Sequence, residues 1–296
     1  MGFDSIESVQ EAMRAQDYVC DRSLATVIFL AMQLDKPILL EGEAGVGKTE
    51  VAKVLAAMLG AKLIRLQCYE GLDANTALYE WNFPRQMLHI KIAETATDTS
   101  TAAIEQEIYS APYLIKRPLL EAIQSGPEQP TVLLIDEIDR SDEEFEAFLL
   151  EVLSDFQISI PELGTIKADR LPLVILTSNR TREIHDALKR RCLFHWIDYP
   201  TFDKEFEIVR TKVPGIDDNL AGQVCQFVET MRQHDFYKRP GVAETLDWAR
   251  ALLYLGRERL DIPTIEETLG CVLKYKEDMD KADEDLLENI LRTLRS

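Results

Sequence analysis

The sequence has no apolar run long enough to cross a lipid bilayer. Its longest run covers residues 24–32, whereas a membrane-spanning helix needs about 20 apolar residues. The chain also does not open with the charged, apolar and small residues that make up a secretory signal. We therefore expect neither a transmembrane segment nor a signal peptide.

Cysteine and histidine are scarce and scattered. The five cysteines form no Cys-x-x-Cys pair and the four histidines lack metal-ligand spacing, so zinc binding and thiol redox chemistry are not indicated. Isolated cysteines in apolar segments usually behave as small buried side chains. The chain also lacks a Gly-x-Ser-x-Gly nucleophile motif, which argues against ester or peptide hydrolysis. We expect a protein of the reducing cytoplasm.

Basic residues are outnumbered by acidic ones. The chain has 33 Lys and Arg against 52 Asp and Glu, a formal net charge of −19. Proteins that bind nucleic acids neutralise backbone phosphates with Lys and Arg, so this charge weighs against a DNA or RNA motor. We expect no nucleic-acid partner, and the acidity also favours solubility.

Short apolar runs alternate with helical patterns up to about residue 199. Near-continuous apolar runs are typical of strands buried on both faces of a parallel sheet, and helices between them predict a three-layer α/β core. The predicted strands are residues 38–41, 63–67, 132–136, 174–177 and 194–198. Helical spacing predicts helices over residues 49–59 and 143–153 within this core.

After residue 200 only helical patterns remain. The predicted helices are residues 203–212, 218–233, 242–255, 265–275 and 283–295. We therefore predict two domains, an α/β nucleotide-binding core over residues 1–200 and a small all-helical lid domain over residues 201–296. The core has predicted insertions near residues 84–118, with a polar break at 95–101, and 156–170, where alternating apolar residues indicate a hairpin.

A phosphate-binding loop follows the first predicted strand. It has the pattern of Gly, four residues and then Gly-Lys-Thr, in which glycines let successive N–H groups converge on phosphate oxygens. In this pattern Lys48 contacts the β and γ phosphates of ATP, and the Thr49 hydroxyl binds Mg²⁺. The residues of the motif are Gly42, Glu43, Ala44, Gly45, Val46, Gly47, Lys48 and Thr49.

Two further strand ends carry polar side chains suited to ATP hydrolysis. Asp136 and Glu137 end the third predicted strand, where Asp136 would contact Mg²⁺ through water and Glu137 would polarise the attacking water. Asn179 follows the fourth predicted strand and would orient that water. The alternatives are a solvated acidic strand end and a turn-forming asparagine.

These motifs, taken in order, resemble those of an AAA+ ATPase of the MoxR branch. Within that branch, residues 63–82, 145–165 and 179–200 are similar to the CoxD-like accessory ATPase found with aerobic carbon monoxide dehydrogenases. The resemblance implies a P-loop AAA+ core with a parallel five-stranded sheet and a helical lid. It also implies a hexameric homo-oligomer with ATP and Mg²⁺ between subunits.

In such a ring, an arginine from one subunit contacts the ATP of its neighbour. Aligned with the family, Arg191 is the first candidate for this arginine finger and Arg190 the second, because guanidinium contacts several phosphate oxygens. A solvated basic turn is the alternative. Arg239 is the candidate for a second nucleotide-contacting arginine, although it precedes a Pro-Gly turn instead of lying inside a helix. A surface salt bridge is its alternative.

Two segments are candidates for contact with a protein client. Residues 79–82 follow the second strand, where AAA+ rings carry pore loops, although their aromatic residues are equally typical of the buried face of an amphipathic helix, which we favour. The hairpin predicted at residues 157–165 is similar to a MoxR-type insertion.

The sequence therefore predicts an ATPase that remodels another protein. The resemblance implies a role in maturing a molybdenum-containing carbon monoxide dehydrogenase-type enzyme, with a von Willebrand A-type partner protein. A nucleic-acid motor has the same nucleotide motifs, and a nucleotide-gated scaffold without remodelling work is a third class.

Overall fold

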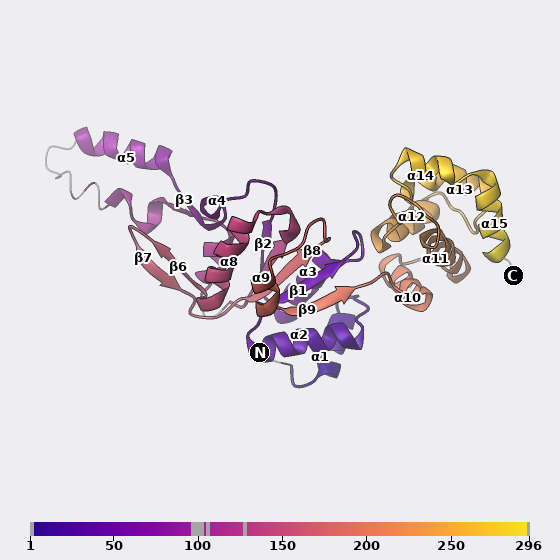
Figure 1. Cartoon of the computed structure of the whole chain (residues 1–296), viewed down its shortest axis with the longest axis horizontal. Helices are drawn as coiled ribbons and strands as arrows, with labels where there is room; N and C mark the ends of the chain where they lie inside the picture. The colour runs from indigo at the N-terminus through magenta and orange to yellow at the C-terminus, as the bar shows by residue number, and fades with distance from the viewer. Residues whose placement is uncertain (1–2, 96–103, 105–106, 127–128, 295–296) are drawn as a thin grey trace. The chain divides into compact units, whose positions relative to one another are not determined.

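The computed structural model describes residues 3–95, 104, 107–126 and 129–294 (Figure 1). The chain forms two compact units. The first contains the residues up to Val9, then Ser23–Glu41 and Thr49–His195, and the second contains Gln10–Arg22, Gly42–Lys48 and the residues from Trp196 onward. The predicted boundary at residue 200 stays a prediction.

A five-stranded parallel sheet forms the centre of the first unit, as predicted (Figure 1). Its strand order is β2-β5-β8-β1-β9. Leu133 of β5 lies opposite Ile64 of β2 and Val174 of β8, so the register aligns the carboxyl ends of the three strands. The strands are β1 (Ile38–Gly42), β2 (Lys62–Gln67), β5 (Thr131–Asp136), β8 (Leu173–Ser178) and β9 (Leu193–Ile197).

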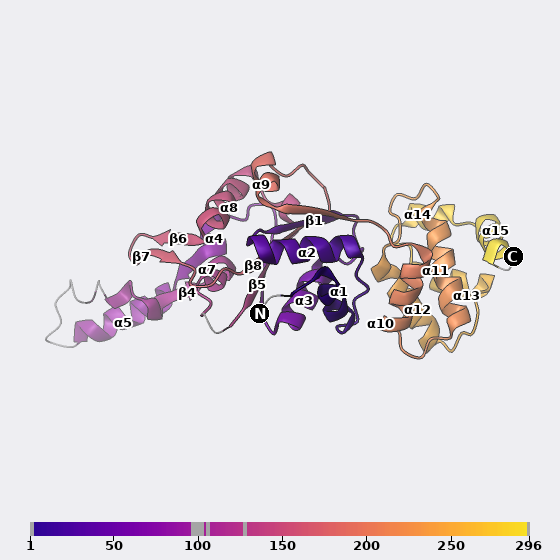
Figure 2. The same ribbon diagram turned by 90° about the horizontal axis from the view of Figure 1, so that it is seen from below.

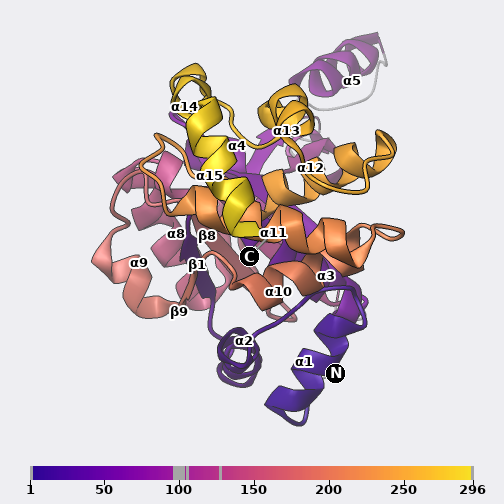
Figure 3. The same ribbon diagram turned by 90° about the vertical axis from the view of Figure 1, so that its right-hand side faces the viewer.

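Helices cover both faces of this sheet, because successive strand side chains point to opposite faces and almost all are buried. Helices α2 (Arg22–Leu34) and α3 (Lys48–Leu59) lie on the other side of the sheet from α8 (Glu143–Asp155) and α9 (Asp186–Arg191) (Figure 2 and Figure 3). The core on the α8 side also includes α7 (Pro118–Ile123). This is the expected three-layer arrangement.

The segment at residues 79–82 corrects one prediction. Tyr79–Trp81 is the short strand β3, which pairs antiparallel with β4 (Leu114–Lys116), so the favoured helix is wrong. Aromatic side chains favour extended backbone on a half-buried surface, which explains the strand. Trp81 is only 8% exposed, and its ring contacts those of Tyr79 and Tyr109 edge-on at centroid distances of 6.1 and 5.3 Å. The expectation of a core side chain is therefore confirmed for Trp81.

The remaining insertions connect these strands to the core. Helix α4 (Ala74–Leu78) precedes β3, while α5 (Phe83–Thr95) and the 3-10 turn η1 (Ala111–Tyr113) lie between β3 and β4. Most of the polar break predicted at residues 95–101 lies outside the described residues. Strands β6 (Gln157–Ile160) and β7 (Gly164–Lys167) pair antiparallel, which confirms the predicted hairpin.

The second unit includes a helical region whose core packs Phe227 against Trp248, with ring centroids 5.0 Å apart. The helix predicted at residues 265–275 is present, but its predicted bounds are wrong, because α13 covers Ile262–Thr268. Asp261 caps the N–H of Thr264 at 2.9 Å, so α13 begins earlier, and Gly270 lies in a 3-10 turn. The elements are α10 (Phe202–Lys212), α11 (Asp218–Arg232), α12 (Val242–Tyr254), α13 (Ile262–Thr268), η3 (Leu269–Cys271), α14 (Lys276–Lys281) and α15 (Glu284–Leu294).

Helix α1 (Ile6–Arg14) precedes α2 in the chain. No helix in the described part of the chain is long and apolar enough to cross a membrane.

Candidate functional site

The phosphate loop lies between β1 and α3 and has the backbone that its glycines allow. Gly45 and Gly47 have φ angles of 79° and 95°, in the left-handed region that other residues rarely adopt. The buried Lys48 Nζ donates hydrogen bonds to the carbonyl oxygens of Gly42 at 2.7 Å and Glu43 at 2.6 Å. The ammonium group is therefore held on the inner side of the loop, and α3 begins at Lys48.

Within the second unit, the first turn of α12 packs directly on this loop. A Cβ atom added to Gly241 would lie 2.8 Å from the Ala44 oxygen and 2.9 Å from Gly45. The Ala243 N–H donates to the Gly45 oxygen at 3.2 Å. Glu244 accepts the Gly241 N–H at 2.9 Å and caps the helix. Because only glycine permits this approach, Gly241 sets how closely the loop and the helix meet.

Buried charged groups hold the segment that leads into α12. Asp278 is fully buried and accepts the N–H groups of Tyr237 at 2.6 Å and Lys238 at 3.0 Å. Arg232 Nε donates to the Pro240 oxygen at 2.8 Å. Backbone on both sides of Arg239 is therefore fixed from the helical core.

The Arg239 side chain is exposed. Its charge and that of Glu43 in the phosphate loop both influence the pKa of Tyr199. Burial raises the pKa of Tyr199, the charge of Glu43 in the loop raises this pKa further, and the charges of Arg232 and Arg239 lower it. Both Glu43 and Arg239 therefore act on the same phenol. The Arg239 guanidinium has no ion pair or hydrogen bond among the described residues, so the salt bridge considered as its alternative is not seen.

In the first unit, Asp136 at the end of β5 collects donors from three elements. Its Oδ1 accepts the Thr49 hydroxyl at 3.1 Å and the Thr177 hydroxyl at 2.5 Å. Its Oδ2 accepts Arg65 Nε at 2.9 Å and Arg65 Nη2 at 2.6 Å. The carboxylate is almost completely buried. The structure thus brings together the two predicted metal ligands, Thr49 and Asp136.

This donor set suits Mg²⁺, which prefers oxygen ligands and binds through one or two protein groups, waters and substrate phosphates. His, Cys, Asp and Glu side chains form no group of three or more that could hold a metal ion among the described residues. Thr49 and Asp136 would therefore share the ion with nucleotide phosphates.

Glu137 has an unusual backbone conformation for a residue with a side chain. Its φ and ψ angles are 56° and 51°, in the left-handed region. Its N–H donates to the Thr177 hydroxyl at 2.9 Å, so one hydroxyl holds both Asp136 and Glu137. Arg140 Nη1 donates to Glu137 Oε2 at 3.2 Å. Such strain is often found at functional sites, where surrounding contacts maintain it.

Asp139 anchors the segment that carries Asn179. Its Oδ2 accepts the N–H of Asn179 at 3.2 Å, the N–H of Thr181 at 2.8 Å and the Thr181 hydroxyl at 2.7 Å. Asp139 is 3% exposed, and its Oδ1 has no partner among the described residues. Sequence analysis missed this residue, although it lies three positions after Asp136.

A second buried acid, also missed, holds the chain between Asn179 and α9. Glu146 is fully buried, pairs with Arg182, and accepts the His185 N–H at 2.7 Å. Arg182 Nε also donates to the Ser141 oxygen at 2.9 Å. Glu146 lies on α8, so that helix fixes the start of α9.

Arg190 and Arg191 end α9 beside the amino-terminal ends of the sheet strands, whereas Asp136 lies at the carboxyl-terminal end of β5. They are exposed and line a hollow of about 540 Å³ together with Asp35 and Pro37, which precede β1. Neither guanidinium has an ion pair among the described residues. The two ends of a strand of five or six residues lie roughly 15–20 Å apart. The structure therefore places Asp136 and Asn179 at the carboxyl-terminal ends of the strands and these arginines at the amino-terminal ends.

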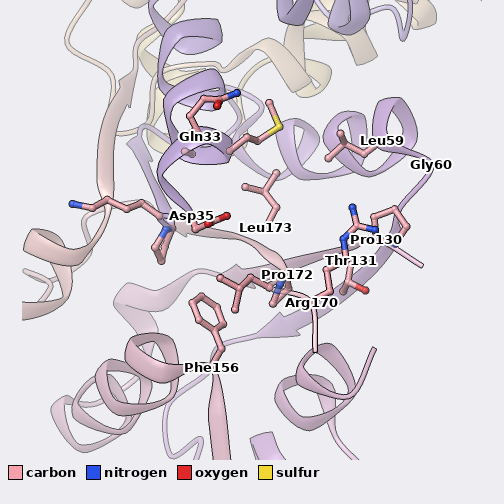
Figure 4. Close-up of a pocket in the computed structure, with 15 residues that line it drawn as sticks. Gln33, Asp35, Leu59, Gly60, Pro130, Thr131, Phe156, Arg170, Pro172 and Leu173 are labelled. Carbon is pink, nitrogen blue, oxygen red and sulfur yellow. The ribbon is translucent and has the colours of Figure 1, made fainter. Parts of the chain in front are cut away.

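A larger cavity of about 720 Å³ adjoins this hollow at the same ends of the strands (Figure 4). Asp35, Leu59, Phe156 and Leu173 are among its lining residues. None of the predicted site residues lines this cavity.

The comparison with protein families decides what kind of protein this is. Residues 37–192 match the model of the AAA domain of the dynein-related subfamily. The chain belongs to this AAA domain family. The family implies nucleotide binding, usually with Mg²⁺, and generally forms rings.

Relatives of this AAA protein include bacterial proteins of similar length. An uncharacterized protein of Staphylococcus haemolyticus is 29% identical over 229 residues, which cover 75% of this chain and 77% of the relative. An uncharacterized protein of Staphylococcus saprophyticus is 26% identical over 241 residues, covering 79% and 80%. Among solved structures, the RuvB Holliday junction branch migration motor of Thermotoga maritima is 17% identical with a TM-score of 0.47, covering 99% of this chain and 80% of that chain.

Proposed function

We propose that this AAA protein hydrolyses ATP in a ring of identical copies and uses the energy to remodel another protein. The observation that carries hydrolysis is the arrangement around Thr177. Its single hydroxyl bonds Asp136 and the backbone of Glu137, so a metal-binding carboxylate and a candidate base share one support. A protein that only senses nucleotide has no need of the base.

Each residue has a distinct role in the proposed reaction. Lys48 leaves its loop carbonyls for the β and γ phosphates of ATP, and Thr49 and Asp136 hold Mg²⁺, which would neutralise charge on the phosphate oxygens. Glu137 accepts the proton of the attacking water. Asn179, fixed through its backbone by Asp139, orients that water.

The proposed ring follows from the separation of the two ends of the sheet strands. Arg190 and Arg191 lie too far from Asp136 of their own chain to stabilise the transferred phosphate. A second copy that presents its nucleotide to the hollow beside α9 would receive an unpaired guanidinium. Head-to-tail contacts of this kind close into rings, and the resemblance to MoxR proteins suggests six copies.

Two features support assigning Arg239 to the same chain's nucleotide. Asp278 and Arg232 fix the backbone around it, and Gly241 packs against the phosphate loop. Arg239 would then report nucleotide binding to the helical region.

For the client, we propose a molybdenum-containing enzyme of the carbon monoxide dehydrogenase type, assisted by a von Willebrand A-type partner. This proposal rests on the resemblance of residues 63–82, 145–165 and 179–200 alone. Deleting the gene is expected to leave such an enzyme inactive, with activity restored by the wild-type gene and not by Glu137→Gln. Full enzyme activity in the deletion strain would contradict this part.

A nucleic-acid motor is less well supported. The net charge of −19 repels a phosphate backbone, so we expect ATP hydrolysis to be unchanged by added DNA or RNA at physiological salt.

The test of the ring is the solution mass of Glu137→Gln with and without Mg-ATP. Loss of the base traps bound ATP, so we expect a shift from a small species to about six subunits, the number that the resemblance to MoxR proteins suggests. The shift should disappear in Glu137→Gln combined with Lys48→Ala, which removes nucleotide binding. A Glu137→Gln protein that binds ATP and stays monomeric would contradict the ring.

A further inference from the structure

The contact between Arg65 and Asp136 is the feature that the proposed reaction does not use. Arg65 lies on β2, and its Nε and Nη2 donate to the same carboxylate oxygen, Asp136 Oδ2, at 2.9 and 2.6 Å. Gln67, two residues along the same strand, accepts Arg65 Nη2 at 2.5 Å. The guanidinium is therefore held in place from two sides.

These bonds occupy the acceptor capacity of Asp136. An ionised carboxylate offers about four lone-pair sites. Thr49 and Thr177 donate to Oδ1, and Arg65 donates twice to Oδ2. No site remains for a metal ion or for a water in its shell unless one donor leaves.

Thr49, the other predicted metal ligand, would turn to the ion and free a place on Oδ1, whereas Oδ2 becomes free only when Arg65 leaves. The Thr177 side chain is buried on the central strand β8 and also accepts the Glu137 N–H. The Arg65 side chain is 53% exposed, so its guanidinium can move into water, where hydration offsets much of the lost ion pair. Its positive charge also opposes a divalent cation on the same carboxylate.

We propose that Arg65 is a gate for Mg²⁺, bound to Asp136 before the metal arrives and displaced by it. This inference rests on the proposed function, because it assigns Asp136 to the metal that accompanies ATP. The gate makes metal entry depend on a movement of Arg65, so nucleotide without Mg²⁺ leaves the Asp136–Arg65 pair intact. Arg65 on β2 is therefore displaced when Mg-ATP binds but not when ATP binds alone.

The test is an equilibrium titration of Mg²⁺ with the full chain and a fluorescent ATP analogue at fixed concentration. The measured quantity is the Mg²⁺ concentration at which the change in binding of the analogue is half complete. This measurement does not depend on hydrolysis. Arg65→Gln should lower this midpoint about tenfold, because a positive charge beside a carboxylate shifts its ion-binding equilibrium by roughly one to three powers of ten. Arg65→Lys, which keeps the charge without the two-pronged contact, should fall between Arg65→Gln and wild type.

Lys62→Gln is the matched control, because it removes the same charge from the same strand. Lys62 pairs with Glu121 instead of Asp136, so its midpoint should equal that of wild type. Thermal unfolding of each variant checks that it is folded.

Three outcomes overturn the gate. A higher midpoint in Arg65→Gln would mean that Arg65 organises the carboxylate for the metal, and an equal midpoint would mean that the contact has no bearing on it. A wild-type protein that binds no nucleotide at any Mg²⁺ concentration would overturn the proposed function together with the gate. If wild type binds nucleotide but Arg65→Gln has the same Mg²⁺ midpoint, the gate is overturned and the proposed function stands.

Discussion

Asp139 Oδ2 accepts two hydrogen bonds from Thr181, one from its N–H at 2.8 Å and one from its hydroxyl at 2.7 Å. This pair joins the turn after β5 to the segment after β8. Because Asn179 lies two residues before Thr181 and also donates to Asp139, the position of Asn179 depends on a carboxylate beside Glu137. Asp139, two residues after the predicted base, thus anchors the predicted water-orienting residue.

Replacing this anchor should separate catalysis from nucleotide binding. Asp139→Ala is expected to lower kcat on the order of 100-fold through misplacement of Asn179, with little change in ATP affinity. Asp139→Asn keeps one oxygen acceptor and should stay closer to wild type. The free energy of unfolding should fall by about 2 kcal/mol in the alanine variant, measured by urea denaturation. Equal kcat values for Asp139→Ala and wild type would contradict this role.

Thr177 tests the support of the other two predicted catalytic residues, Asp136 and Glu137. Thr177→Val keeps the shape of the side chain but removes the hydroxyl that bonds Asp136 and the Glu137 N–H. We expect kcat to fall and the free energy of unfolding to decrease by about 1–3 kcal/mol, because buried polar groups lose partners. Thr177→Ser retains the hydroxyl and is the control. A valine variant with the steady-state kinetics of the serine variant would show that the hydroxyl is not needed.

Gly241 tests the contact between the phosphate loop and α12. In Gly241→Ala the new Cβ would lie 2.8 Å from the Ala44 oxygen and 2.9 Å from Gly45 backbone atoms, so the loop must move. ATP affinity and the melting temperature should both fall. Gly222→Ala is the control, since its Cβ would meet only Phe206 at 3.9 Å and the change favours the helix by about 0.5–1 kcal/mol. Unchanged ATP affinity in Gly241→Ala would argue against the contact.

Arg239 is compared with its neighbour in the chain. Arg239→Ala should weaken ATP binding several-fold in a fluorescence titration. Lys238 contributes its backbone N–H to Asp278, and alanine keeps that bond, so Lys238→Ala should bind ATP as wild type does. Equal ATP affinities for the two variants would remove Arg239 from the site.

Three buried thiols predict how stability changes with pH. Burial raises the pKa of Cys68, Cys192 and Cys225 to about 12 from a reference value of 9.0. The folded protein therefore holds these protons where the unfolded chain releases them, so the free energy of unfolding should fall as pH rises from about 9 towards 12. Denaturation of Cys225→Ala should show a shallower fall than wild type over that range. Equal slopes would contradict the raised pKa of Cys225.

Much of the fold followed from the apolar pattern alone. The five sheet strands lie close to their predicted bounds because their side chains are buried on both faces, which produces continuous apolar runs. Strand β3 has only three residues, and its partner β4 follows a long insertion, so no local periodicity could reveal it. Gly270 likewise shortened a helix whose apolar spacing continued beyond it.

The parts of the site that the sequence predicted are those whose functional residues are contiguous in the chain. The phosphate loop and the Asp136–Glu137 pair have such patterns. Asp139 and Arg65 do not, because their partners lie 42 and 71 residues away and depend on neighbouring strands being aligned. Long-range pairs of this kind are visible only in three dimensions.

The central claim is that one active site takes residues from two copies, and mixing two inactive variants tests it most directly. Arg191→Ala keeps its nucleotide site and lacks the arginine, whereas Glu137→Gln keeps the arginine, still binds ATP and lacks the base. Each should be inactive alone. An equal mixture should recover about a quarter of wild-type ATPase activity, the share of head-to-tail interfaces that pair an intact site with an intact arginine. A mixture as inactive as its components would contradict the shared site.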